Sequence, residues 1–91
     1  LFSVEEAREY GFVTRIADDP RALALDTARE IAARNPDAMR ASKRLFNAAH
    51  DLSPAEGLLM ESQEQDLIIG RPNQVEAVMA ELEKRPAVFR D

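Results

Sequence analysis

The sequence predicts an all-α fold of about five short helices, and three observations lead to that prediction. Helix start signals, made of a capping residue or a proline, recur along the 91 residues. Apolar residues at helical spacing follow each of them. Residues 12–16 (FVTRI) mix apolar and polar side chains as a short half-buried strand does, and no second strand is evident to pair with them. We therefore expect an extended segment there and helices elsewhere.

The first helix is expected to begin after Ser3. Ser3 and, three residues later, Glu6 form a capping box, and Phe2 can pack on Ala7 as a hydrophobic staple. Gly11 should end this helix, because glycine adopts the left-handed backbone conformation at little cost.

The second and third helices are expected to begin at proline. Asp19 caps the second, and Pro20 occupies its first position, where a missing amide hydrogen does no harm. Asn35 and Pro36 repeat this arrangement for the third. The apolar stripe of the second helix is Ala24, Ala28, Ile31 and Ala32. One face of the third helix is Ala38, Ala41, Leu45, Ala48 and Ala49, and another is covered by Arg40, Lys43, Arg44 and Asn47.

The fourth and fifth helices complete the prediction. Ser53 and Glu56 form a second capping box, so that the fourth helix should begin at Pro54 and run to Gly70. The fifth helix is expected to have Asn73 as its cap, with Glu76 at its third position, and to end before Pro86. Its apolar stripe is Val75, Val78, Met79 and Leu82.

Composition excludes several classes of protein. Without cysteine, the chain has no disulfide framework and no thiolate metal site. A net charge of −5 argues against a general nucleic-acid binder. No apolar run is long enough to span a membrane, and the first residues do not read as a secretion signal, so a cytoplasmic location is expected. A first residue of Leu1 in place of methionine suggests a piece of a longer protein.

A search for catalytic chemistry predicts no catalytic residue and no metal site. The single histidine, His50, ends the third helix, where a solvated capping role is expected. Paired acidic residues at helix starts favour the helix dipole and are interpreted as caps; they are Glu5, Glu6, Asp18 and Asp19. The acidic residues of the fourth helix are interpreted as its solvated face; they are Glu61, Glu64 and Asp66. No glycine-rich phosphate loop is present.

Two basic groups leave two interpretations open. One is Arg40, Lys43 and Arg44 on the third helix, and the other is Lys84 and Arg85 at the end of the fifth. Each can be a solvated set of cations near a helix C-terminus. Each can also clamp a phosphate, with lysine as a mobile point charge and arginine as a rigid fork.

Four segments, in order, resemble motifs of the enoyl-CoA hydratase/isomerase (crotonase) family. Residues 3–13 (SVEEAREYGFV) resemble (S/A)-A-E-E-A-x-x-x-G-L-V, and residues 35–43 (NPDAMRASK) resemble (S/N)-P-x-A-x-x-x-x-K. Residues 56–61 (EGLLME) resemble the end of L-x-x-G-L-x-x-E. Residues 73–85 (NQVEAVMAELEKR) resemble (D/N)-x-x-E-G-x-x-A-F-x-E-K-R. The set spans nearly the whole chain and is specific for the superfamily but not for one reaction.

The resemblance implies the C-terminal helical region of such an enzyme, without its upstream α/β spiral domain. Residues 1–17 would be a lead-in helix and extended segment, and residues 18–91 the helical oligomerisation part. The family assembles as a trimer or a dimer of trimers. Its substrate is a coenzyme A thioester and it needs no separate cofactor. Its oxyanion hole and acid/base glutamates lie upstream, so no catalytic residue is assigned to this chain.

One binding residue is implied by the same resemblance. The lysine of the family's terminal E-K-R can reach the phosphate or adenine region of coenzyme A, and here it is Lys84. The family aromatic that can contact the adenine is replaced by Glu81, which cannot stack and would repel a phosphate. The family glycine after Glu76 is Ala77, a better helix former.

Three functions remain open from the sequence. The first is the assembly region and coenzyme A edge of an enzyme that hydrates a 2-enoyl-CoA. The second is another reaction of the superfamily, such as isomerisation, thioester hydrolysis, decarboxylation or dehalogenation. The third is a free-standing helical interaction module. No nucleic-acid or membrane partner is expected. The apolar stripes of the last two helices favour self-association or docking onto the upstream domain.

Overall fold

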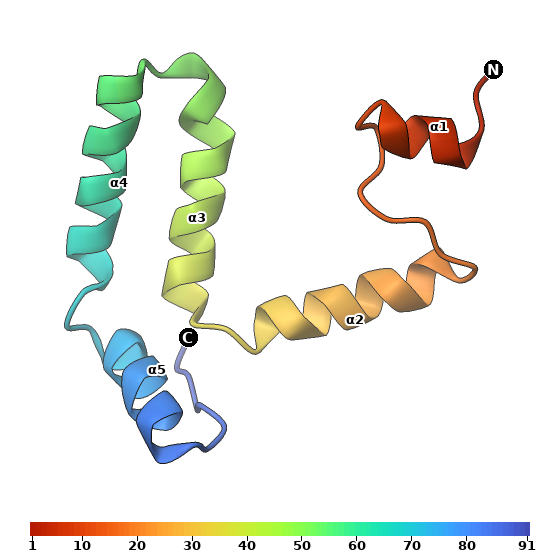
Figure 1. Cartoon of the computed structure of the whole chain (residues 1–91). Coiled ribbons are helices and arrows are strands. Elements are labelled where there is room, and N and C mark those ends of the chain that lie inside the picture. The colour runs from red at the N-terminus through yellow and green to blue at the C-terminus, as the bar shows by residue number, and fades with distance from the viewer. The chain divides into compact units, whose positions relative to one another are not determined.

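The computed structural model describes residues 1–91 and contains helices and no strand, which confirms the all-α prediction (Figure 1). The elements are α1 (Val4–Glu9), α2 (Pro20–Ala32), α3 (Pro36–Ala48), the 3₁₀ turn η1 (Ala49–Asp51), α4 (Pro54–Ile68) and α5 (Pro72–Glu83). Contacts divide the chain into two units, Leu1–Glu30 and Ile31–Asp91. The predicted division of roles at residue 17 stays a prediction.

The start of the first unit follows its local sequence signals. The Ser3 hydroxyl accepts from the Glu6 amide at 3.1 Å, and the Glu6 carboxylate accepts from the Ser3 amide at 2.7 Å, so the capping box is confirmed. Gly11 has a φ of 80°, which a side chain would strain. The ring of Phe2 packs against those of Tyr10 and Phe12, with centroids 5.9 and 5.5 Å away. Residues 12–16 form neither helix nor strand, as expected.

Helix α2 begins as predicted but buries a different face. The Asp19 carboxylate accepts from the Ala22 amide at 3.0 Å and caps the helix. The predicted stripe, by contrast, is exposed along its whole length. The half-buried positions are Leu23 and Thr27, and Arg15 donates to the Thr27 hydroxyl at 3.4 Å. Arg15 thus contacts the Thr27 side of the helix, and apolar spacing alone could not predict which side that would be.

The second unit is built on a hairpin of two helices. Figure 1 shows α3 and α4 side by side and antiparallel, joined through η1, with α5 following α4. Ala41 of α3 and Ala80 of α5 are the buried apolar residues of this unit, each 3% exposed. No large side chain of the chain is fully buried. Most of the apolar surface that the helices could place in a core therefore faces outward in the chain by itself.

An ion pair crosses the α3–α4 hairpin and corrects the interpretation of Glu64. Arg44 donates through Nε and Nη2 to the two carboxylate oxygens of Glu64, at 2.7 and 2.6 Å. Glu64 is 8% exposed, so it does not belong to a solvated face, whereas Glu61 and Asp66 are exposed as expected. The hydrogen bonds from Arg44 lower the pKa of the Glu64 carboxyl against the opposing effect of desolvation.

Helix α4 ends slightly earlier than predicted. Its capping box is present, with the Ser53 hydroxyl accepting from the Glu56 amide at 3.2 Å. The helix stops at Ile68, because Ile69 is extended and Gly70 has a φ of 74°. This turn directs the chain into α5, which carries the candidate site.

Candidate functional site at the end of helix α5

Asn73 lies inside α5 and does not cap it, contrary to the prediction. The cap position is Arg71, and Pro72 occupies the first helical position. Asn73 is 6% exposed, and its amide group exchanges two hydrogen bonds with the backbone of Arg90, at 2.8 and 2.7 Å. Its nitrogen also donates to Asp37 at 2.9 Å. Asn73 therefore ties the C-terminal tail to both α5 and α3.

A signal for this arrangement was present in the sequence. Helices α2, α3 and α4 all begin with proline at the first position, preceded by the capping residue. The same rule applied to Pro72 places Arg71 at the cap and Asn73 within the helix. Because no short polar side chain stands before Pro72, the sequence pattern points instead to Asn73, directly after Pro72, as the cap.

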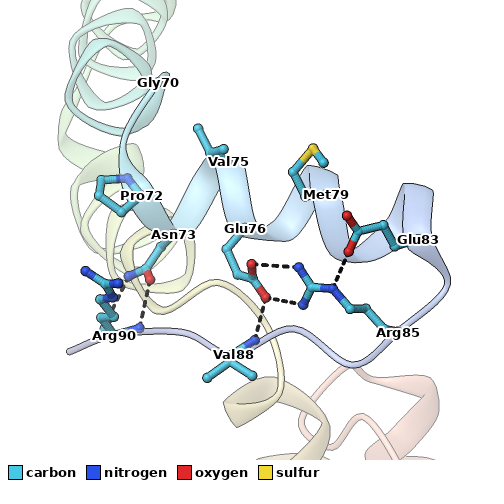
Figure 2. Close-up of a pocket in the computed structure, with 10 residues that line it drawn as sticks. All are labelled: Gly70, Pro72, Asn73, Val75, Glu76, Met79, Glu83, Arg85, Val88 and Arg90. Atoms are coloured by element: carbon cyan, nitrogen blue, oxygen red, sulfur yellow. Dashed lines mark hydrogen bonds and ion pairs between the residues drawn. The ribbon is translucent and has the colours of Figure 1, made fainter.

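The tail folds back along α5 through a cluster that we call the C-terminal hook, formed by Glu76, Arg85 and Val88. Arg85 donates to both carboxylate oxygens of Glu76, at 2.6 and 3.0 Å, and also pairs with Glu83 (Figure 2). The Val88 amide donates to Glu76 at 2.8 Å. Glu76 was expected next to a cap at Asn73, and it instead closes a loop from Arg85 to the tail.

A groove of about 560 Å³ is lined by residues of α5 and of this tail. Figure 2 shows Val75 and Met79 of α5 directed away from the tail, whereas Glu76 points toward the Arg85 guanidinium. Besides these four residues, the groove is lined by Gly70, Pro72, Asn73, Glu83, Val88 and Arg90. The groove thus combines an apolar side from α5 with charged groups that largely pair with each other.

The stability of the C-terminal hook should depend on pH over a defined range. The hydrogen bonds from Arg85, followed by that from Val88, lower the pKa of Glu76 to about 2. A lowered carboxyl pKa stabilises the folded state above the unfolded pKa, near 4.3, and this contribution is lost as pH falls toward 2. We expect hydrogen exchange at the Val88 amide, corrected for its intrinsic pH dependence, to lose protection between those values. Glu76→Gln should remove this transition, and a transition that persists in this variant would contradict the assignment.

Lys84 differs from its neighbour Arg85. Lys84 has left-handed backbone angles, φ 52° and ψ 44°, at the position where a helix usually ends with glycine. Its amide bonds to the Glu81 carbonyl at 3.2 Å, and the Arg85 amide bonds to the Ala80 carbonyl at 3.0 Å. The Lys84 side chain is exposed and forms no ion pair in the structure, whereas Arg85 is held by two carboxylates.

The basic group on α3 is largely engaged in ion pairs. Arg44 pairs with Glu64, and Arg40 pairs with the exposed Asp91 at 3.1 Å. Lys43 is exposed and forms no ion pair. Of the five cations considered from the sequence, the two lysines are therefore those without a carboxylate partner.

The other candidate residues do not gather into a site. His50 lies in η1, exposed and 3.4 Å from the Asp51 carboxylate. No group of three or more histidine, aspartate and glutamate side chains is placed to hold a metal ion. No helix has the length and apolar character needed to cross a bilayer.

The fold of this chain is similar to part of a solved structure. The chain matches the crystal structure of an enoyl-CoA hydratase from Polaromonas sp. JS666, with a TM-score of 0.84 and 27% sequence identity. The match covers 98% of this chain and 35% of that chain, so this chain spans about a third of the length of that protein. The chain has the fold of the C-terminal part of a crotonase-fold protein, which confirms the resemblance drawn from the four motifs.

Two further comparisons give no match. No family model matches the chain, and no curated protein does.

Proposed function

We propose that this chain is the C-terminal helical region of an enoyl-CoA hydratase/isomerase family enzyme that acts on acyl-CoA thioesters. The observation that carries the proposal is the likeness to an enoyl-CoA hydratase over 98% of this chain, at 27% identity. Hydration of a 2-enoyl-CoA is the proposed reaction, in the cytoplasm. The intact protein should bind an acyl-CoA and hydrate a short 2-enoyl-CoA, measured by loss of the conjugated enoyl absorbance. Failure to bind any acyl-CoA would refute the proposal.

Within that enzyme, the proposed role of this region is assembly into a trimer or a dimer of trimers. Support comes from the apolar side chains that α4 and α5 leave exposed, among them Leu58, Leu67 and Leu82. Burial of each such side chain against another subunit would contribute roughly 1–2 kcal/mol. The α5 stripe is likewise exposed, with Val78 at 47% and Leu82 at 72%.

Catalysis is proposed to reside outside this region. The chain offers no acid/base pair and no strained nucleophile, and its buried carboxylate, Glu64, is paired with Arg44. Isomerisation, thioester hydrolysis and decarboxylation remain alternatives within the superfamily, and an assay panel on the intact protein separates them by product. A purified 91-residue chain that hydrates an enoyl-CoA at an enzymatic rate would refute this division of roles.

The second proposed role is an electrostatic contact from Lys84 to a phosphate of coenzyme A. Support comes from its exposed, unpaired ammonium group on a backbone fixed by helix-ending hydrogen bonds. We expect Lys84→Met to raise the KM for an acyl-CoA about 5- to 10-fold, with a weaker salt dependence, because one charge pair is lost.

Lys84→Gly separates binding from folding at the same position. Glycine relieves the left-handed backbone strain, so the variant should be as stable as the parent or more stable by up to about 1 kcal/mol. Its KM should nevertheless rise as in Lys84→Met. An unchanged KM in both variants would remove Lys84 from the coenzyme A site.

A further inference from the structure

The backbone of Lys84 is anchored on both sides. On the helix side, the Lys84 and Arg85 amides bond to the carbonyls of Glu81 and Ala80. On the tail side, Arg85 is fixed by its two bonds to Glu76. A non-glycine residue in the left-handed region is strained and persists only where the surroundings determine its conformation. The contacts of Arg85 hold the Lys84 backbone in this conformation.

Glu76 is the group on which these anchors converge. Its carboxylate accepts two hydrogen bonds from Arg85 and one from the Val88 amide, so one side chain of α5 holds the chain on both sides of Pro86. Its side chain is 23% exposed and the Arg85 side chain 39%, so the pair is partly shielded from water. Figure 2 shows this carboxylate bonded both to the Arg85 guanidinium and to the Val88 amide of the tail.

If only its charge mattered, Glu76 would weaken the binding of a phosphate at Lys84. A carboxylate near an anion-binding lysine lowers phosphate affinity, and its removal would raise that affinity. Glu83 pairs with the same guanidinium but makes no hydrogen bond to the tail. Both glutamates therefore place a negative charge at Arg85, but only Glu76 also binds the tail.

We propose that Glu76 is a positioning residue for coenzyme A binding, which acts by fixing Arg85 and the tail so that Lys84 is presented to a phosphate. This inference rests on the proposed function of Lys84. An anchored backbone does not have to be ordered when the lysine binds a phosphate, so less entropy is lost on binding.

The test compares Glu76→Gln with Glu83→Gln in the intact protein. Each variant removes one negative charge from the surroundings of Arg85, and the glutamine is nearly isosteric with the glutamate. We expect Glu76→Gln to raise the KM for a short 2-enoyl-CoA about 3- to 10-fold with kcat little changed. Glu83→Gln should leave the KM equal or slightly lower. A KM that falls or stays the same in Glu76→Gln would overturn the proposal.

A double variant separates this inference from the proposed role of Lys84. If Glu76 acts through Lys84, Glu76→Gln added to Lys84→Met should raise the KM no further, because coupled residues are not additive. An additive increase would overturn the inference. An unchanged KM in Lys84→Met would instead refute the phosphate contact and the inference with it. A raised KM in Lys84→Met but not in Glu76→Gln would refute the positioning role alone.

Discussion

The 91-residue chain by itself is expected to self-associate and not to persist as a 10.2 kDa monomer. Its buried apolar residues are three alanines, Ala7, Ala41 and Ala80, which release little apolar surface from water. Large apolar side chains on α4 and α5 remain exposed, with Leu82 at 72% and Leu58 at 65%. Large apolar side chains left exposed in this number are typical of a protein that buries them in an interface. Light scattering coupled to size exclusion should give a mass of at least a dimer at micromolar concentration.

Substitutions on these helices test which surface is responsible. Leu82→Glu and Leu58→Glu place a charge in the proposed contact and should reduce the apparent mass or weaken association more than tenfold, because burial of an unpaired charge is strongly unfavourable. Gln63→Glu is the matched control, since it adds the same charge at an exposed polar position of α4 and should have little effect. A monodisperse monomer that melts cooperatively would contradict the assembly role.

Loss of Arg44 is expected to be among the most destabilising single substitutions in the second unit. The Glu64 side chain is 11% exposed and the Arg44 side chain 51%. Arg44→Met would leave a nearly buried carboxylate without its partner, whereas Glu64→Gln would leave a cation that water still reaches. We expect Arg44→Met to lower the Tm by more than about 5 °C and Glu64→Gln to lower it less.

Three comparisons make this prediction specific. Arg40→Met removes an exposed ion pair, whose partner Asp91 is 94% exposed, and should change the Tm by little. Arg44→Met with Glu64→Leu should recover much of the loss, because the buried charge is gone. The Arg44→Met defect should also lessen as acid protonates Glu64. Equal losses for Arg44→Met and Arg40→Met, at the same protein concentration, would show that the hairpin does not depend on this pair.

Local sequence signals were sufficient to predict where most of the helices begin. The two capping boxes, at Ser3 and Ser53, depend on hydrogen bonds between residues three apart, and the structure contains both. Proline at the first helical position was predicted correctly for α2, α3 and α4. The predicted start of α5 at Asn73 was wrong because this asparagine, a residue type common at helix caps, lies inside the helix after Pro72.

The sequence alone determined the helical class, the approximate bounds of the five helices and the resemblance to the crotonase family, because caps, glycine turns and apolar spacing act within a few residues. Only the tertiary structure decided the partners of Glu64, Asn73 and Glu76, which lie 20, 17 and 9 residues away along the chain. A side chain's charge does not specify a distant partner; that partner is fixed by how the helices pack and where the tail turns back. For the same reason, Lys84 and Arg85 look alike in sequence, yet one is unpaired and the other holds the C-terminal hook.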